Sequence, residues 1–240
     1  MLKRHISKSL SLLFKATIVL SISISAQAVV VPVAQDCSVI GQDYASQNLN
    51  GNTFNGGLFS GVDGLAGNDN PSRFYLKFNL PAYTPGTIVS SATLTGFYNA
   101  DWSAADDRTH SLYLAANDSW TETSITWNTQ PGPTGSALGV FNAAVSTPSN
   151  FLSWTITGAA NGEYLGDGVL SVMFRADDES LVGSNNNWEY FASKEYDPTL
   201  AFRLTLEITQ VPEPAGASML VVGILAFFAR LRLSARQRST

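Results

Sequence analysis

The sequence predicts an all-β domain, a sandwich or barrel of about eight to ten short strands. Segments in which apolar and polar side chains alternate recur along the chain, and this period of two residues is typical of half-buried strands. Turn-forming Gly, Pro, Asn and Asp residues separate these segments. Between residues 29 and 210 no segment has the apolar spacing of a helix longer than about two turns, and no internal repeat is present.

Two terminal segments of different composition flank this domain. Met1–Ala28 has a basic start and an apolar run, and it ends in Ala-Gln-Ala. This three-part pattern is typical of a secretory signal peptide that is cleaved before Val29. The domain is therefore expected to span residues 29–210, and the tail comprises residues 211–240.

The expected domain is strongly acidic. Residues 29–210 hold 6 Lys and Arg residues against 18 Asp and Glu residues, which gives a net charge of −12, whereas the basic ends bring the whole chain to −5. This charge argues against nucleic acid and anionic membranes as partners and is compatible with cation binding. Cys37 is the only cysteine of the chain, so the chain has no internal disulfide.

The expected strands follow one another at short intervals. Arg73–Leu80 is the clearest of them, because its apolar side chains occupy every second position. Gly132–Asn150 is expected to be a long irregular crossing with one short strand, and Thr157–Leu165 to form one or two helical turns. The other expected strands lie at Ser38–Ile40, Leu58–Val62, Ile88–Tyr98, Ser111–Ala116, Phe151–Ile156, Val169–Phe174, Trp188–Ser193 and Leu200–Ile208.

The segment Trp120–Pro131, with the sequence WTETSITWNTQP, is the most distinctive part of the domain. Its Trp, Thr and Ile residues favour the pleated surface of a strand, and the Asn, Pro and Gly residues at its end forbid continuation. We therefore predict a strand and a turn that cross the middle of the domain. Trp120 and Trp127 are expected in the core, because aromatic rings dominate core packing.

With these segments assembled, the domain resembles the DNRLRE family, whose members include the family-96 carbohydrate-binding modules. The resemblance covers residues 36–208. It implies a jelly-roll-like antiparallel β-sandwich that occurs in secreted bacterial proteins and sometimes binds acidic polysaccharides such as alginate. Thr155 stands where the family often has an aspartate, and no binding motif carries over. The matching segments are RFYLKFNL at 73–80, SATL at 91–94, WTETSITWNTQP at 120–131, WTIT at 154–157, FASKE at 191–195 and PTL at 198–200.

The C-terminal tail resembles a PEP-CTERM sorting signal, which an exosortase processes in bacteria that export polysaccharide. Pro212, Glu213 and Pro214 precede an apolar stretch, Ala215–Ala229, and four arginines follow it. A helix of this stretch reaches about 22 Å against a hydrocarbon core of about 30 Å, so we expect a short transmembrane helix that anchors the chain temporarily. The arginines favour a cytoplasmic C-terminus. An ordinary single-pass anchor is the alternative.

Catalytic motifs are scarce in the domain. It contains no Gly-rich phosphate loop, no His/Cys metal spacing and no nucleophile elbow. His110 has no nearby nucleophile motif and is expected on the surface or at a strand edge. Paired carboxylates serve glycoside hydrolases and lyases, but Glu122 and Glu195 lie in the family's fold motifs, where a structural hydrogen bond is the simpler interpretation. We therefore predict that the protein is not an enzyme.

Tryptophans in polar segments are the predicted sugar-binding residues, because sugar rings stack on exposed aromatic faces. Trp102 lies in a polar loop, and Trp188 follows three asparagines, Asn185–Asn187, that offer hydrogen bonds to hydroxyl groups. Tyr190 shares a strand face with Trp188. The alternative, that both tryptophans only close an edge of the sandwich, stays open.

Two acidic loops are candidate Ca²⁺ sites, although the sequence requires no cofactor. Hard carboxylate oxygens suit calcium, but neither spacing matches a loop such as the EF-hand, and solvated surface charge is the alternative. A bound calcium would help an acidic module to approach an anionic glycan. The two sets are Asp101, Asp106 and Asp107, and Asp177, Asp178 and Glu179.

These expectations describe an exported, non-catalytic β-sandwich protein. It is expected to be anchored transiently in the inner membrane and then sorted to the cell surface or the extracellular matrix. Its expected partners are an exosortase-type sorting enzyme and an extracellular polysaccharide, with no nucleic acid. Its expected role is to bind carbohydrate or to contribute to the polysaccharide or biofilm matrix. A purely structural or adhesive surface protein without a sugar site is the alternative, and a polysaccharide lyase or hydrolase is the third.

Overall fold

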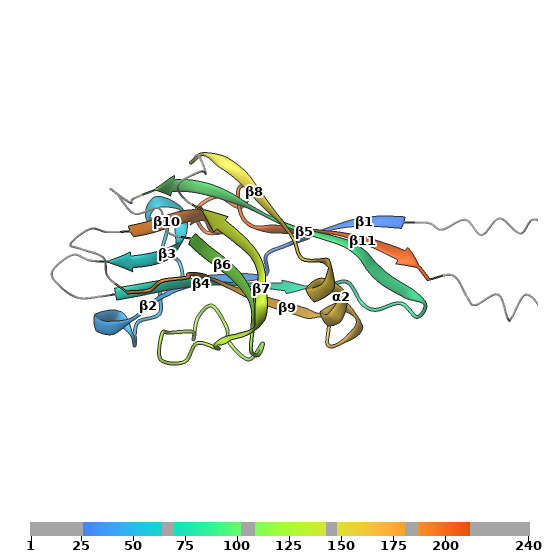
Figure 1. Cartoon of the computed structure of the whole chain (residues 1–240), viewed down its shortest axis with the longest axis horizontal. Helices are drawn as coiled ribbons and strands as arrows, with labels where there is room; N and C mark the ends of the chain where they lie inside the picture. Colours follow the sequence, from blue (N-terminus) through green and yellow to red (C-terminus); the bar gives the residue numbers. More distant parts are fainter. Residues whose placement is uncertain (1–25, 64–69, 102–108, 143–147, 181–186, 212–240) are drawn as a thin grey trace, which may run out of the picture. The chain divides into compact units, whose positions relative to one another are not determined.

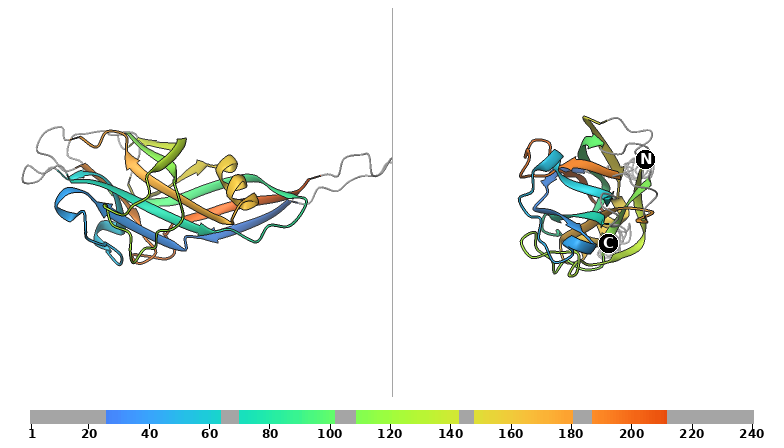
Figure 2. Two further views of the ribbon diagram at one scale, coloured as in Figure 1. Left: turned by 90° about the horizontal axis from the view of Figure 1, so that it is seen from below. Right: turned by 90° about the vertical axis from the view of Figure 1, so that its left-hand side faces the viewer.

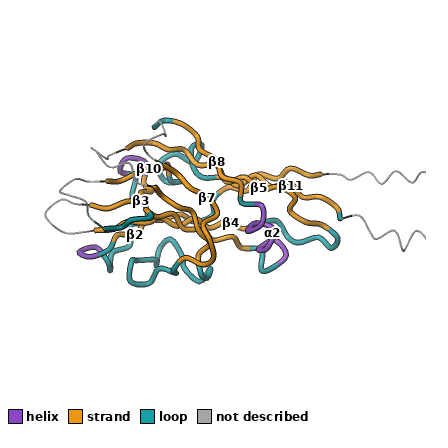
Figure 3. The backbone as a smooth tube through the Cα atoms, in the orientation of Figure 1, coloured by secondary structure: helices purple, strands orange, loops and turns teal. Residues whose placement is uncertain are grey.

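The computed structural model describes residues 26–63, 70–101, 109–142, 148–180 and 187–211. These residues form eleven antiparallel strands in one continuous sheet, two single 3-10 turns and one short α-helix (Figures 1 and 3). The strands are β1 (Ala26–Pro32), β2 (Gln35–Ile40), β3 (Gly57–Asp63), β4 (Asn70–Asn79), β5 (Thr87–Asp101), β6 (Thr109–Ala115), β7 (Pro133–Asn142), β8 (Asn150–Thr155), β9 (Val169–Ala176), β10 (Asn187–Ala192) and β11 (Arg203–Gln210). The turns are η1 (Gln42–Tyr44) and η2 (Phe54–Gly56), and the helix is α2 (Thr157–Leu165).

The sheet is curled, as the end view in Figure 2 shows, and it packs around the main apolar core. Its strand order is β1-β11-β5-β10-β3-β4-β9-β6-β7, while β2 also pairs with β4 and β8 also pairs with β5. β8 and β7 meet where the sheet curls back, because the Trp154 indole N–H donates to the Val140 carbonyl oxygen at 3.1 Å. The predicted all-β sandwich is confirmed.

The core is filled by alternate side chains of the facing strands. Phe74 of β4 stacks on Phe174 of β9 with ring centroids 4.9 Å apart, and both rings contact Phe191 of β10. Phe202 completes this aromatic group from the chain just before β11, at 5.7 Å from Phe74. Gly96 makes room for the Phe202 ring, because a Cβ at residue 96 would lie 2.1 Å from it.

A second apolar cluster lies on the outer side of β2, β4 and β9. Cys37, Tyr75 and Met173 point away from the main core, and Trp120 and Ile125 cover them. The covering segment, residues 116–132, is named the Trp120 loop below. The expected core position of Trp120 is confirmed, since it is 4% exposed.

The Trp120 loop contains no strand, so the predicted strand is wrong. Its backbone groups bond within the loop: the N–H groups of Ser124 and Ile125 both donate to the Thr121 carbonyl oxygen. The Thr126 N–H donates to the Thr129 hydroxyl at 3.0 Å. Thr and Ser side chains satisfy the backbone locally here, and this competes with pairing to a neighbouring strand.

The two ends of the domain pair with each other. β1 lies antiparallel to β11, with Ala26 opposite Thr209 and Pro32 opposite Arg203. β1 therefore includes Ala26–Ala28, which the sequence assigns to the signal peptide, and cleavage before Val29 stays a prediction. β7 also differs from expectation, since ten residues form a strand where a mostly irregular crossing is predicted.

The sorting tail lies outside the described residues. The tail includes Pro212, Glu213, Pro214 and the apolar stretch 215–229. The sorting signal and the short transmembrane helix therefore stay predictions. Within the part of the chain that the structure describes, no helix is long and apolar enough to cross a membrane.

Candidate functional site

Four aromatic side chains gather where β3, β10 and η2 meet, and this group is named the aromatic patch. Phe59 stacks on Trp188 with centroids 5.0 Å apart, and Trp188 meets Tyr190 edge-on at 6.1 Å. Phe54 is 53% exposed and packs edge-on against Tyr190 at 6.0 Å. The patch therefore presents Phe54 and part of Trp188 to solvent, over a buried base of Phe59 and Tyr190.

Glycines allow η2 to approach the segment that follows β10. Gly56 and Gly57 have φ values of +116° and +94°, which favour glycine because other residues are strained there. A Cβ at residue 57 would lie 2.5 Å from the Ser193 hydroxyl oxygen. The Ser193 N–H donates to the Gly56 carbonyl oxygen at 2.6 Å. This contact fixes η2 and places Phe54 against Tyr190.

The structure separates the three predicted sugar-binding residues. Trp188 is partly exposed, as a binding residue requires. Tyr190 shares its strand face but is fully buried beneath Phe54 and Phe59, so its assignment to sugar binding is corrected. Trp102 lies outside the described residues. Sequence analysis missed Phe54, although a single aromatic residue in an Asn/Gly-rich loop is the same signal that drew attention to Trp102.

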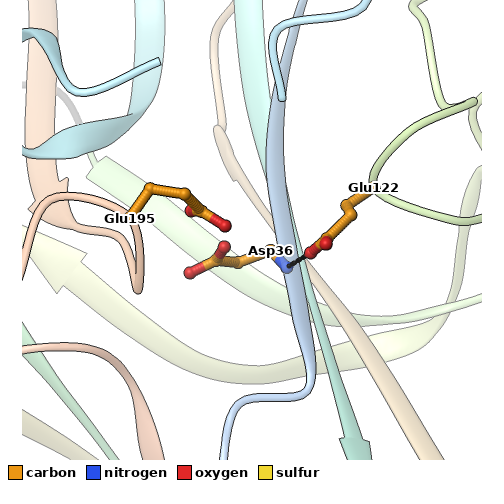
Figure 4. A group of neighbouring side chains, drawn as sticks. All are labelled: Asp36, Glu122 and Glu195. Carbon is orange, nitrogen blue, oxygen red and sulfur yellow. Dashed lines mark hydrogen bonds between the residues drawn. The ribbon is translucent and has the colours of Figure 1, made fainter. Parts of the chain in front are cut away.

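A second cluster joins three carboxylates, Asp36 of β2, Glu122 of the Trp120 loop and Glu195 after β10. Their oxygen atoms lie within 4.8 Å of one another. In Figure 4 the Asp36 and Glu195 carboxylates face each other, while Glu122 approaches the Asp36 backbone from the other side. The Asp36 N–H donates to the Glu122 carboxylate at 3.4 Å. This group is named the Asp36 cluster.

Lys194 provides the positive charge of the Asp36 cluster. Its ammonium nitrogen lies 3.4 Å from the Asp36 carboxylate and 2.5 Å from that of Glu195, and it also contacts Glu122. The Lys194 backbone N–H donates to Asp36 at 2.9 Å. A lysine thus takes the position that a cation would otherwise occupy, so the cluster is an ion-pair network.

The carboxylates of this network differ in proton affinity. Burial raises the pKa of Asp36 to about 7, and the Glu195 charge adds to this, although the Lys194 N–H group and charge oppose it. Burial also pushes the pKa of Glu195 upward, but hydrogen bonds with Lys194 and Asp36 outweigh it and bring that pKa below its ordinary value. A proton shared by Asp36 and Glu195 therefore resides mainly on Asp36.

The acidic residues of the second predicted calcium loop do not converge. Glu179 forms a bidentate ion pair with Arg73, with both N–O distances at 2.6 Å. The Asp178 carboxylate accepts hydrogen bonds from the backbone and hydroxyl of Ser180, and Asp177 is exposed. Glu179 and Asp178 therefore already bond to other groups of the protein.

The first predicted calcium loop lies mostly outside the described residues. Asp101 is the last residue of β5, and its strand neighbour on β10 is Glu189. Asp106 and Asp107 are not described. Calcium binding by this loop stays a prediction.

His110 is fully buried, so the expected surface or edge position is wrong. Its Nδ1 lies 3.0 Å from the Ser60 hydroxyl oxygen, and its ring lies against Phe141 and Phe174. The alternation of β6 predicts this burial. His110 and Leu112 are two residues apart and lie on the same face of the strand, and Leu112 faces the core. A buried hydrogen-bonded histidine in an aromatic environment is part of the packing.

A comparison with protein-family models decides the family. The model of carbohydrate-binding module family 96 matches residues 29–207, which is most of the chain. The chain belongs to this family. The match to the family-96 modules includes both the aromatic patch and the Asp36 cluster, since their residues all lie within the matched range.

The other comparisons add little to the assignment of the chain to family 96. No curated protein matches the chain. Among solved structures, the chain is similar to the K3 cleaved adhesin domain of Lys-gingipain from Porphyromonas gingivalis, with 13% sequence identity and a TM-score of 0.23. The match covers 58% of this chain and 65% of that one, and similarity at this level carries no argument about fold or function.

Proposed function

We propose that this family-96 module is a non-catalytic glycan-binding domain and that its aromatic patch holds the sugar. The exposure of Phe54 and of part of Trp188, which both contact Tyr190, carries this proposal. An aromatic ring buries up to about 150–250 Å² on contact, and at about 25 cal/mol per Å² two rings supply several kcal/mol before entropic costs. Gly61 is the cross-strand neighbour of Trp188 on β3 and has no side chain to cover the indole ring.

The platform is rigid, which lowers the entropic cost of binding. Trp188 lies in β10, which pairs with both β3 and β5, and Phe59 supports its ring from below. Phe54 rests on Tyr190 and is fixed through η2. Little ordering is required of either ring when a sugar binds.

The proposed location is the cell surface or the extracellular polysaccharide matrix. The signal pattern of residues 1–28 supports export. The Pro-Glu-Pro motif, apolar stretch and arginines of residues 211–240 support transient anchoring in the inner membrane and processing by an exosortase-type enzyme. At this location, a domain that binds glycan would contribute to the matrix.

Calorimetric titration of residues 29–210 against alginate and neutral polysaccharides, with calcium and with chelator, tests the binding proposal. We expect Trp188→Ala and Phe54→Ala each to weaken binding by about tenfold or more, because each loses one stacking surface. Tyr83→Ala is the matched control, since Tyr83 is 49% exposed outside the patch and its loss should leave affinity unchanged.

Three results would contradict the proposal. Binding that survives both patch substitutions would move the sugar site elsewhere on the domain. An absence of heat with every glycan would favour a structural or adhesive surface protein without a sugar site. Cleavage of a polysaccharide, lost on substitution of a carboxylate, would instead support the lyase or hydrolase.

A further inference from the structure

We propose that the Asp36 cluster is a pH-responsive latch on the Trp120 loop, which holds the loop closed in mildly acidic solution and loosens as the solution becomes neutral. This inference goes beyond glycan binding and does not depend on it. It rests on the position of a fully buried carboxylate between two segments that are far apart in the sequence.

The Asp36 cluster connects three elements. Asp36 lies in β2, which pairs along its whole length with β4 and is therefore fixed. Glu122 is the residue through which the Trp120 loop reaches the cluster, and its own N–H donates to the Gln35 side chain at 3.2 Å. Lys194 and Glu195 belong to the turn after β10. A change in charge at Asp36 thus acts on the loop and on the turn.

The charge balance of the cluster depends on one proton. With Asp36 protonated, the Lys194 ammonium faces two other carboxylates, those of Glu122 and Glu195. With Asp36 ionised, a single ammonium faces three carboxylates. Leu76 is the cross-strand neighbour of Asp36 on β4 and brings no charge, and the adjacent Cys37 stays a neutral thiol because burial raises its pKa to about 12.

Water reaches an ionised Asp36 only when the segments that cover it open. The Asp36 side chain is completely buried, whereas those of Lys194, Glu122 and Glu195 are each about one-quarter exposed. β2 is fixed, so the movable parts are the Trp120 loop and the turn after β10. Opening of the loop lets water reach Asp36 and separates it from Glu122.

The direction of the effect follows from proton linkage. Burial raises the pKa of Asp36 from an ordinary value of 3.8 to about 7 in the closed form, so the closed form binds the proton more tightly than the open form. The latch is therefore strongest below the ordinary pKa of an aspartate, weakens progressively as the pH rises from about 4 to about 7, and changes little above that.

Hydrogen exchange of the full chain, in detergent, tests the latch. Exchange of peptides from the Trp120 loop is compared with that of β9 at about pH 5 and about pH 7.5, after correction for the intrinsic exchange rate. We expect the opening equilibrium of the loop to rise about tenfold or more over this range, with no matching rise in β9.

Three variants make the test specific. Asp36→Asn keeps the shape of the side chain without its titration and should abolish the rise in loop opening. Glu207→Gln removes an exposed carboxylate outside the cluster and should preserve the rise. Glu195→Gln removes a negative charge that raises the pKa of Asp36. This variant should therefore move the rise in loop opening to lower pH.

The proposal is overturned by loop opening that changes less than about threefold between the two conditions. It is equally overturned by Asp36→Asn behaving like the unmodified chain. Carboxyl-carbon NMR provides an independent check that requires no substitution. An Asp36 signal that is already that of a carboxylate at about pH 5 excludes the latch.

Discussion

The ammonium group of Lys77 lies 4.5 Å from the centre of the Trp120 ring and donates hydrogen bonds to the Trp120 and Asp118 carbonyl oxygens. Lys77 is 7% exposed and points to the outer side of β4, beneath the Trp120 loop. One buried cation therefore holds both the ring and the backbone of the loop. The loop depends on this contact, since it forms no strand of its own.

Lys77→Met should destabilise the domain by about 2–4 kcal/mol. The substitution keeps the aliphatic stem, but it leaves two carbonyl oxygens without their donor and removes the contact with the Trp120 ring. Denaturant unfolding followed by tryptophan fluorescence measures the loss. Arg203→Met is the control, because the Arg203 guanidinium lies over the exposed Phe151 ring and should contribute less than about 1 kcal/mol. Equal losses in the two variants would contradict the role given to Lys77.

Trp120→Ala should cost about 3–5 kcal/mol, as is typical when a large aromatic side chain is removed from a core. Trp120 is almost fully buried against Tyr75, with ring centroids 5.7 Å apart. Trp127 is only half-buried and stacks under Arg73, so Trp127→Ala should cost clearly less. Thermal unfolding of the two variants gives the comparison, and a larger effect at Trp127 would refute this order.

Gly96→Ala and Gly162→Ala should have opposite effects. A Cβ at residue 96 overlaps the Phe202 ring, and we expect a loss of about 1–3 kcal/mol from overpacking. Residue 162 lies in α2 with open space around its Cα, so alanine there should add up to about 1 kcal/mol through helix propensity. Calorimetric melting temperatures should fall in the first variant and rise in the second.

Cys37 should be unreactive toward thiol reagents in the folded domain at about pH 8. It is 2% exposed, and burial raises the pKa of its thiol to about 12, so very little thiolate is present. Labelling in native conditions and in denaturant should differ by more than about a hundredfold in rate. Thr123→Cys adds an exposed thiol to the Trp120 loop and should react at once. Rapid native labelling of Cys37 itself would show that the loop does not cover it.

Most of the strands were predictable because one face of each packs against the main core. β1, which was not predicted, and β7, of which only one short strand was predicted, are mostly exposed. In β4 the alternation of Phe74, Leu76 and Phe78 determines the strand and its orientation. The same alternation assigns Tyr75 to the outer face, yet Tyr75 is fully buried beneath the Trp120 loop. Periodicity reports which face a residue occupies, and it does not report whether a loop from elsewhere covers that face.

The sites were less predictable for the same reason. Phe54 and Trp188 are more than a hundred residues apart in the sequence, and they belong to one patch only because both rings contact Tyr190 of β10. The Asp36 cluster also joins distant segments, although Glu122 and Glu195 were recognised as structural residues. The Trp120 loop was misassigned because its Trp, Thr and Ile residues favour strands, whereas its Thr side chains bond to the backbone of their own loop.

The course of β5 has a mechanical consequence. At one end Thr87 pairs with Gln210, close to the point where the chain leaves the domain, and at the other end Asp101 pairs with Glu189, next to the aromatic patch. If the proposed sugar site at Trp188 and the proposed attachment beyond Val211 both hold, tension between them runs along the strands. β11 is then loaded in shear along its whole pairing with β5, and many hydrogen bonds must break together. Under those two proposals, force would act parallel to β5 and β11 and not in the direction that separates the strands one hydrogen bond at a time.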